Sequence, residues 1–560
     1  MKKSSVDKTA LSFLFRQAYM FSPLLALLII LNSVVIFAVI FLAIVTKNLV
    51  DAAFSIEGHS RILENILLYL LIIVVYVLFE MGASFLSVYL NERFEFHVRR
   101  KMFHTILKSK WQEISAYHSE DLMVRLTSDI RSVASGIVDT FTAIVGLVIS
   151  LFAAFITLFY YDKTIAMFAF ALGPVAVCFN LYFGKKLKYY QLKVQENEAK
   201  YRAFMQENLA NITVVKSFTN EEMMSEWLFR LYRERMKWVN KKNRLTILMS
   251  STVSFSFSLG YIAALSWGVL KMSMNAMSFG TLTIFLNLVN RIQSPIIKLA
   301  QTIPNLSSVI ASAGRIVEID GQLLENYEKT AIKTSQMGIV FKDVHYSYHD
   351  RVIFENLNLT IKPGSFVAVT GASGIGKTTL IRLMMNFLEV DGGTIAYQYN
   401  SESGTSEIAA SPAIRNYISY VPQGNTLFSG RIKDNLLIGN AEMTEEDIFS
   451  ILESASLLDF VKMLPHGIDT LIGEKGHGLS EGQAERIAIA RALSKAAPIM
   501  IFDEATAALD EKNEQEIIKS IRRIKNTPTC IFITHRRGTL TLMDEEINLE
   551  KLATVDNFDT

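Results

Sequence analysis

The chain has 560 residues, of which 50% are hydrophobic and only 20% are charged, and its formal net charge is +2. A chain of this length exceeds one compact domain, so at least two units are expected, and the near-neutral charge gives no reason to expect a nucleic-acid partner. An ordinary soluble domain is about a quarter charged, so some block of this sequence must lack charge.

The cysteines and the N-terminus give no sign of a disulfide framework, a cysteine metal site or a cleaved signal peptide. Cys178 and Cys530 lie far from each other and from any histidine pair at metal-ligand spacing, so they predict neither a disulfide framework nor a metal site. Residues 1–20 are basic, and their apolar stretch has no small-residue cleavage pattern. We therefore expect them to form a cytosolic segment ahead of the membrane helices rather than a cleaved signal peptide.

Six runs in the first half of the chain contain no charged residue. They cover 21–46, 65–79, 140–161, 164–184, 245–270 and 272–290. A helix that crosses the roughly 30 Å bilayer core needs about 20 apolar residues, because lipid offers the backbone no hydrogen-bond partners. Five runs reach or approach this length, and the second reaches it when its helix continues past Glu80 to Leu90. The sequence therefore predicts about six transmembrane helices within residues 21–305.

Lysine and arginine are concentrated in two long connections. One follows the second run, from Arg93 to Lys110, and the other follows the fourth run, from Lys185 to Arg244. Because basic connections stay in the cytosol, both termini are predicted to be cytosolic, in a plasma or inner membrane. The helical periodicity of these connections indicates that the spans continue beyond the lipid bilayer as long cytosolic extensions.

Two ionisable residues stand apart in this apolar half. Glu80 lies within the second span, and Arg291 directly follows the sixth run. A charge at membrane depth is costly unless it faces a cavity or a partner, so both are candidate substrate-contacting residues. Both could equally be interfacial side chains that reach the headgroup region. The serines and threonines between Ser250 and Ser258 could line a polar pathway or allow close helix packing.

The pattern changes after Pro304. We expect residues 306–337 to form a linker, with a helix over residues 307–319 and a polar stretch over 320–337, and residues 338–560 to form a second domain. There, short β-branched strands alternate with helical patterns, which is typical of an α/β sheet. The expected strands cover 338–344, 365–370, 418–421, 498–502 and 529–534.

A glycine-rich loop follows the second of these strands. It reads Gly371-Ala372-Ser373-Gly374-Ile375-Gly376-Lys377-Thr378-Thr379, and a helical pattern continues to Phe387. Between a strand and a helix, such a loop turns successive backbone N–H groups and the helix N-terminus toward phosphate. Lys377 is expected to reach the β- and γ-phosphates and Thr378 to hold Mg²⁺. The predicted fold is thus an all-α six-helix transmembrane bundle joined to an α/β P-loop domain that binds ATP and Mg²⁺.

A second motif, which is acidic, supports this interpretation. Four apolar residues, 499–502, lead into Asp503 and Glu504, which places both carboxylates at the C-terminal end of a strand. Ligands of open α/β sheets bind at that end. Asp503 is expected to complete the Mg²⁺ shell, and Glu504 is expected to polarise the attacking water.

A third motif, Leu479-Ser480-Glu481-Gly482-Gln483, precedes a helical run that ends at Leu493. With the other motifs it resembles the signature of ATP-binding-cassette (ABC) transporters of the exporter type, in which a half-transporter carries both domains on one chain. The resemblance covers nearly the whole chain. It implies that Ser480 and the Gly482 backbone contact the γ-phosphate held by a second subunit. The family usually has glycine where this chain has Glu481, and an anionic side chain at this position must either point away from the phosphate or weaken the closed state.

The resemblance assigns roles to further residues. It implies that Tyr348 stacks on adenine, that Gln423 contacts Mg²⁺ and water, and that His535 bonds the γ-phosphate; Tyr348 could alternatively be a core aromatic of its strand. Two interface residues are also implied: Glu474, in a loop that reads the cytosolic helices, and Asp510, in a loop that crosses the dimer interface. Residues 207–218 resemble the second cytosolic connection of exporters, and the chain after His535 is shorter than the family pattern.

These motifs favour an ATP hydrolase that drives transport as a dimer. Because one chain carries every motif, a homodimer is the simpler prediction, although a different partner chain stays open. The sequence leaves the transported substrate open between a lipid, a drug-like hydrophobic compound and a peptide. An importer with the same architecture, and a nucleotide-gated channel or regulatory membrane ATPase, are the alternatives. The sequence has no N-terminal peptidase domain, so a leader-cleaving peptide exporter is not favoured.

Overall fold

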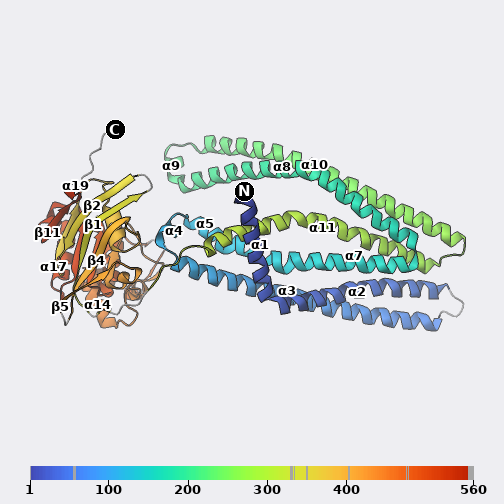
Figure 1. Cartoon of the computed structure of the whole chain (residues 1–560), viewed down its shortest axis with the longest axis horizontal. Coiled ribbons are helices and arrows are strands. Elements are labelled where there is room, and N and C mark those ends of the chain that lie inside the picture. Colours follow the sequence, from blue (N-terminus) through green and yellow to red (C-terminus); the bar gives the residue numbers. More distant parts are fainter. Residues whose placement is uncertain are drawn as a thin grey trace. The chain divides into compact units, whose positions relative to one another are not determined.

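The computed structural model of the chain describes residues 2–54, 59–327, 332, 334–348, 351–401, 404–473, 476, 478–506 and 508–552. The chain forms two compact units (Figure 1). The first, called here the membrane unit, comprises Met1–Leu107 and His118–Gly321. The second, called the nucleotide unit, comprises Lys108–Tyr117 and Gln322–Thr560.

The membrane unit is helical throughout its described part. Its elements are α1 (Lys2–Met20), α2 (Ser22–Ala53), α3 (His59–Lys108), α5 (Ser119–Val124), η1 (Arg125–Asp129), α6 (Ile130–Ser135), η2 (Gly136–Thr140), α7 (Phe141–Tyr161), α8 (Lys163–Ala210), α9 (Ile212–Ser217), α10 (Glu221–Ser273) and α11 (Phe279–Asp320). The short α9 joins α8 to α10, which run side by side (Figure 1). α11 packs along α7 and α2.

The length and composition of these helices agree with a membrane location. Among the described residues, four helical segments are long and apolar enough to cross a membrane: Ser22–Ala53, Arg61–Lys108, Ser119–Tyr161 and Glu221–Ser273. The two remaining charge-free runs lie in α8 and around the start of α11. α3 exposes large apolar side chains such as Leu70, Leu71 and Val74, which suits a helix surrounded by lipid because lipid removes the cost of exposing apolar surface.

Carboxylates accept hydrogen bonds from the first N–H groups of two helices in the membrane unit. Asp162, between α7 and α8, accepts hydrogen bonds from the backbone N–H groups of Thr164 (2.9 Å) and Ile165 (3.2 Å), and its other oxygen accepts one from Lys271 (2.5 Å). At the start of α11, Asp51 accepts a hydrogen bond from the N–H group of Gly280 (2.9 Å). These carboxylates satisfy helix N–H groups that have no partner within the helix.

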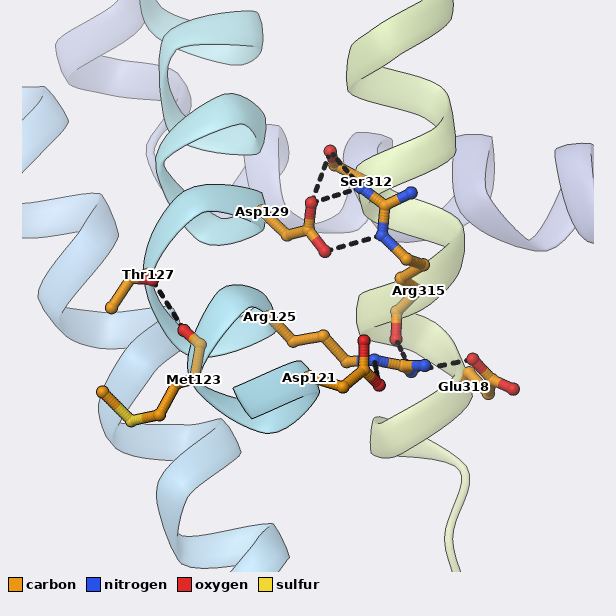
Figure 2. A network of polar contacts seen from close by, with 8 residues as sticks. All are labelled: Asp121, Met123, Arg125, Thr127, Asp129, Ser312, Arg315 and Glu318. Atoms are coloured by element: carbon orange, nitrogen blue, oxygen red, sulfur yellow. Dashed lines mark hydrogen bonds and ion pairs between the residues drawn. The ribbon is translucent and has the colours of Figure 1, made fainter. Parts of the chain in front are cut away.

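A buried ionic cluster joins the start of the third span to the end of α11 (Figure 2). Asp129, which is 2% exposed, accepts hydrogen bonds from Ser312 Oγ (2.9 Å) and Arg315 Nε (2.7 Å). One turn away, Arg125 donates to Glu318 (2.7 Å) and to Asp121 (2.9 Å). Because every buried charge has a partner of opposite sign, the two helices are held together without a large penalty for burial.

The last helix of the membrane unit is continuous with the helix expected after Pro304. α11 runs through Pro304 and continues to Asp320, so the helix expected over residues 307–319, inside the linker of residues 306–337, is the end of α11. Ala313, Ile316 and Ile319 on its final turns are fully buried in a hydrophobic cluster with α1, α3 and α6. This packing outweighs the tendency of proline to end a helix, because tertiary burial overrides local propensity.

The nucleotide unit is built on two main sheets. One is antiparallel, with strand order β2-β1-β4-β5, and the other is parallel, with order β11-β3-β10-β9-β6. The strands are β1 (Met337–Tyr348), β2 (Arg351–Ile361), β3 (Phe366–Thr370), β4 (Gly392–Ser401), β5 (Gly404–Ala409), β6 (Ile418–Val421), β7 (Gly430–Arg431), β8 (Leu471–Ile472), β9 (Ile499–Asp503), β10 (Thr529–Ile533) and β11 (Glu545–Asn548). All five expected strands are present. The polar residues 400–401 and 404–406, whose composition is typical of a loop, belong to the β4–β5 pair.

Helices cover the sheets of this unit. They are α4 (Trp111–Ser115), α12 (Lys377–Met384), η3 (Pro412–Tyr417), α13 (Ile432–Leu437), α14 (Glu445–Ser454), α15 (Leu458–Met463), η4 (Gly467–Asp469), α16 (Glu481–Ser494), α17 (Glu511–Arg522), α18 (Arg537–Leu540) and α19 (Leu549–Leu552). The parallel sheet separates two hydrophobic clusters. Phe502 and Phe532 stack at 4.5 Å on the side of α16 and α17, whereas Ile501 and Ile531 pack toward α12 and the antiparallel sheet.

The cluster of Figure 2 yields a stability prediction. Replacing Asp129 by alanine strips Ser312 and Arg315 of a buried acceptor, so the free energy of unfolding should fall by about 2 kcal/mol. Replacing Glu318, whose side chain is 54% exposed, should cost less than about 1 kcal/mol because water screens the pair. Thermal unfolding in detergent, followed by tryptophan fluorescence, measures the difference. Equal midpoints for Asp129→Ala and Glu318→Ala would contradict a stabilising role for the buried carboxylate.

Candidate nucleotide-binding and hydrolysis site

The phosphate loop leaves β3 and wraps around its own lysine. Gly371, Gly374 and Gly376 have φ angles of +139°, +83° and +115°, in the region that side chains with a Cβ rarely adopt. Lys377, the first residue of α12, is buried and its Nζ donates to the carbonyl of Gly371 (2.6 Å). The N–H group of Ala372 donates to Glu550 (2.8 Å). The loop therefore folds back on the Lys377 ammonium, which bonds its first carbonyl.

The rest of the loop follows the same course. Ser373 is exposed, Ile375 is half-buried, Thr378 is exposed at the start of α12, and Thr379 is 7% exposed. The N-terminus of α12, an eight-residue helix, opens directly onto the loop. Its unpaired N–H groups and its dipole favour an anion at this position.

His535 contacts the phosphate-loop lysine. Its Nε2 lies 2.8 Å from Lys377 Nζ, which donates to it. The contact arises because β10, which ends two residues before His535, pairs in parallel with β3, which leads into the loop. Parallel pairing brings the carboxyl ends of the two strands to the same edge of the sheet. The predicted lysine and histidine therefore meet across about 160 residues of sequence.

The two acidic residues lie on the neighbouring strand of the same edge. β9 pairs in parallel with β10 and with β6. Asp503 is 6% exposed and accepts a hydrogen bond from the hydroxyl of Tyr420 (3.0 Å), and Glu504 accepts one from the amide of Gln423 (2.7 Å). The sequence did not single out Tyr420, although it lies in the motif that contains Gln423.

The electrostatics of this pair follow from burial. Burial raises the pKa of Asp503, and the nearby charge of Glu504 adds to the rise, while the hydrogen bond from Tyr420 opposes it. Glu504 has a φ angle of +51°, which is strained for a residue with a side chain and is found mostly at functional positions. This backbone turn separates the directions of the two adjacent carboxylates.

These side chains suit a magnesium ion. The predicted donors are the hydroxyl of Thr378, the carboxylate of Asp503 and the amide oxygen of Gln423, all of them the hard oxygen ligands that Mg²⁺ prefers. No group of three or more His, Cys, Asp or Glu side chains poised to hold a metal occurs in the described part of the chain. A single carboxylate fits Mg²⁺, because this ion is usually held by one or two carboxylates together with substrate phosphates.

Tyr348 ends β1 at the other side of the site. It is half-buried, its ring packs edge-on against Tyr346 at 5.0 Å, and its hydroxyl accepts a hydrogen bond from Arg382 of α12 (3.3 Å). The guanidinium of Arg382 in turn lies over the ring of Trp111 on α4, 4.7 Å from its centroid. The tyrosine is thus fixed from one side, and its partial exposure leaves surface on which a base could stack.

The signature residues begin α16. Ser480 is the N-cap, and it forms a capping box with Gln483: Ser480 Oγ accepts from the N–H of Gln483 (3.3 Å), and Gln483 Oε1 accepts from the N–H of Ser480 (2.9 Å). Glu481 is exposed in the first turn, where the helix dipole favours an acidic side chain. A Cβ at Gly482 would lie 3.0 Å from the carbonyl oxygen of Ala508. Leu479 packs against the core.

The structure gives one interface residue a local role. Asp510 is the N-cap of α17, and its carboxylate accepts hydrogen bonds from the N–H (2.8 Å) and side-chain amide (2.7 Å) of Asn513. These hydrogen bonds lower the pKa of Asp510. Glu474, the other predicted interface residue, lies outside the residues that the structure describes.

The two candidate substrate residues come from different helices of the membrane unit. Glu80, on α3, is exposed and interacts electrostatically with Tyr76, one turn earlier on the same helix. Arg291, on α11, is half-buried and interacts electrostatically with Tyr76. Tyr76 therefore links the two predicted residues, and only their arrangement in space identifies it.

Comparisons with known proteins find matches to both units of the chain. The model of the ABC transporter transmembrane region matches residues 25–296, and the model of the ABC transporter matches residues 354–507. An ATP-dependent lipid A-core flippase of Desulfotalea psychrophila is 30% identical over 77% of this chain and 75% of its own length. A protein of the same name from Syntrophus aciditrophicus is 28% identical over 91% of this chain and 85% of its own length.

A solved structure has the same fold. The structure of a bacterial Atm1-family ABC exporter with ATP bound superimposes with a TM-score of 0.78. The two chains are 23% identical, and the match covers 94% of this chain and 93% of that one. The fused arrangement of a helical transmembrane unit and an α/β nucleotide unit is therefore shared between them.

The geometry of Tyr348 generates a prediction for nucleotide affinity. Because stacking on an aromatic ring contributes about 1–3 kcal/mol per base, Tyr348→Ala should weaken ATP binding by at least about fivefold. Tyr348→Phe keeps the ring and loses only the hydroxyl that Arg382 contacts, so its affinity should stay near that of the wild type. Titration with a fluorescent ATP analogue measures both. If the alanine variant binds as tightly as the phenylalanine variant, Tyr348 is a core aromatic only.

Proposed function

Because the chain belongs to the ABC transporter family, we propose that it exports an amphipathic, lipid-like substrate, using ATP hydrolysis at two sites shared between two identical chains. The chain is a membrane-embedded ATPase coupled to transport. The finer parts of the proposal, which are the substrate, the dimer partner and the roles of single residues, rest on the contacts described above. The observation that carries it is the convergence of Lys377, His535, Asp503 and Glu504 at one edge of the parallel sheet.

Lys377 and His535 form the phosphate-binding part of the proposed site. Lys377 Nζ donates to a loop carbonyl and to His535, and a bound γ-phosphate would accept from both side chains in place of these contacts. A cation at this position stabilises the charge that spreads over the phosphoryl oxygens during transfer. Mg²⁺, when bound by Thr378, Asp503 and Gln423, would neutralise further phosphate charge.

Glu504 is proposed to orient and deprotonate the attacking water. Its carboxylate is half-buried and held by the amide of Gln423. Gln423 can therefore keep the carboxylate in one orientation while it also contacts the water. A carboxylate placed within hydrogen-bond reach of the nucleophile accelerates the reaction by typically about 10²–10⁴-fold.

A second copy of the chain would complete each site. The capping box of Ser480 and Gln483 turns the start of α16 outward, with Ser480 and Glu481 exposed. An exposed helix N-terminus with a serine is suited to bind the phosphate of another subunit. A homodimer is the simplest arrangement because this chain carries the phosphate loop, the acidic motif and the signature together.

The substrate assignment rests on the polar residues of the membrane unit. Tyr76, Glu80 and Arg291 place a hydroxyl, a carboxylate and a guanidinium near one another at or next to charge-free stretches of α3 and α11. Such groups are expensive at membrane depth unless they face a polar partner. A molecule with a charged headgroup and an apolar tail would match both this cluster and its surroundings. The names of the flippase relatives support a lipid-like substrate.

The role of Glu504 gives a direct prediction. Glu504→Gln keeps the hydrogen-bonding shape of the side chain but removes the base, so the rate of ATP hydrolysis should fall by at least about a hundredfold. ATP binding should be retained. Phosphate release and nucleotide titration on the purified, reconstituted chain measure the two quantities separately. Hydrolysis at the wild-type rate would overturn the assignment of Glu504 as the base.

Transport itself is tested in inside-out vesicles that contain the reconstituted chain. With ATP outside, a fluorescent lipid should move to the vesicle interior or its inner leaflet, and Glu504→Gln should abolish this movement. Arg291→Ala should reduce lipid-stimulated hydrolysis while leaving basal hydrolysis unchanged. Loss of preloaded lipid from the vesicles would instead identify an importer. Stimulation by peptides or drug-like compounds alone would contradict the lipid assignment.

A further inference from the structure

One buried acidic side chain connects the signature helix to the loop that follows the catalytic strand. Glu485 lies on α16, one turn after the signature residues, and is 7% exposed. Both of its carboxylate oxygens accept from the backbone N–H of Ala508, at 3.2 and 3.0 Å. Ala508 belongs to the loop of residues 504–510, which runs from Glu504 to the N-cap of α17. Neither the family motifs nor the site described above assigns a role to Glu485.

The same loop is held from a second side by the residue next to His535. Arg536 Nη1 donates to the carbonyl of Leu509 (2.7 Å) and to Glu514 (3.2 Å). Glu514, which is 1% exposed, also accepts from the hydroxyl of Thr506 (2.7 Å). The loop is therefore bound both by the signature helix and by the segment that carries the phosphate-binding histidine.

The packing of the signature helix against the loop is close. A Cβ at Gly482 would lie 3.0 Å from the carbonyl oxygen of Ala508 and 3.6 Å from Leu509 Cδ2. A side chain at this position would push the loop away from α16. The N–H and the carbonyl of Ala508 thus both face the first two turns of the signature helix. A shift of the loop would therefore change its contacts with that helix.

We propose that Glu485 is a positioning residue for ATP hydrolysis, which locks residues 504–510 to the signature helix so that Glu504 of one site and Ser480 of the other move as one body. The proposal rests on the dimeric arrangement of the proposed function. In that arrangement Glu504 serves the ATP bound by its own chain, and Ser480 serves the ATP bound by the partner. The Glu485–Ala508 contact then links the two ATP sites through a single chain.

The chemistry of the contact explains why an acidic side chain is placed here. Burial raises the pKa of Glu485, and the nearby charges of Glu481 and Glu514 add to the rise. The hydrogen bond from Ala508 and the charge of Arg536 oppose it. A buried carboxylate is costly without hydrogen-bond donors. The Ala508 N–H is such a donor. Release of the loop would leave the buried carboxylate without it, and this cost favours the bonded state.

Three variants at this position separate the hydrogen bond from the charge. Glu485→Ala removes the acceptor, Glu485→Asp keeps the charge but shortens the side chain by one methylene, and Glu485→Gln keeps the length and an acceptor oxygen. Glu516→Ala, an exposed position on α17, is the matched control. The assays use the full-length chain reconstituted in lipid.

Substitutions of Glu485 should change kcat for ATP hydrolysis but leave the apparent KM for ATP nearly unchanged. Loss of one hydrogen bond to a charged group should lower kcat about tenfold in the alanine and aspartate variants, with the KM for ATP within about twofold of wild type. The glutamine variant should retain most of the activity, and Glu516→Ala all of it. If kcat for both alanine and aspartate variants stays within twofold of wild type, or if glutamine is as impaired as alanine, the proposal is overturned.

Hydrogen exchange tests the contact itself. Without nucleotide, the Ala508 amide should exchange slowly in the wild type and at least about tenfold faster in Glu485→Asp. This measurement needs no transport and no ATP, so it separates failure of this proposal from failure of the proposed function. It also decides the case if the alanine variant does not fold. An unchanged exchange rate at Ala508 in the aspartate variant would overturn the proposal.

Discussion

The arrangement of the site depends on the in-register parallel pairing of four strands. β10 pairs with β3 on one side and with β9 on the other, and β9 pairs with β6. Because parallel strands end at a common edge, the residues that directly follow them are brought together whatever their separation in sequence. Lys377, Gln423, Glu504 and His535 come from four separate segments, and none of them could reach the others without this register. The hydrophobic faces of the same strands, buried on both sides, keep the register from slipping.

From this edge, contacts within the nucleotide unit extend in two directions. On one side, the chain from Glu504 leads into a loop bound by Glu485 and Arg536, which ties the hydrolytic residues to the signature helix. On the other side, Tyr348 contacts Arg382, whose guanidinium lies over Trp111 of α4. α4 lies between α3 and α5 in the sequence, and both of those helices belong mainly to the membrane unit.

Much of this organisation could be predicted from the sequence, because it depends on local sequence patterns. The charge-free runs predicted the transmembrane helices, and the strand–loop–helix motif predicted the phosphate loop. The antiparallel sheet was harder to predict, since β4 ends and β5 begins with the polar residues 400–401 and 404–406, which are typical of a loop. The helix over residues 307–319 was expected, but its continuity with the last span was not, because the end of α11 is held by burial of Ile316 against distant helices. Tyr420 and Glu485 have no motif of their own, and only their contacts in space reveal them.

The central claim is that an ATP molecule bound at the phosphate loop of one chain is enclosed by the signature of another. It is tested most directly by cross-linking. Chains in which the native cysteines Cys178 and Cys530 are replaced would carry either Ser373→Cys or Ser480→Cys, and the two would be reconstituted together and oxidised. The account predicts a disulfide between two different chains that forms much faster when ATP and Mg²⁺ are present. Cross-links that form equally without nucleotide, or no cross-link between the two chains in either condition, would contradict it.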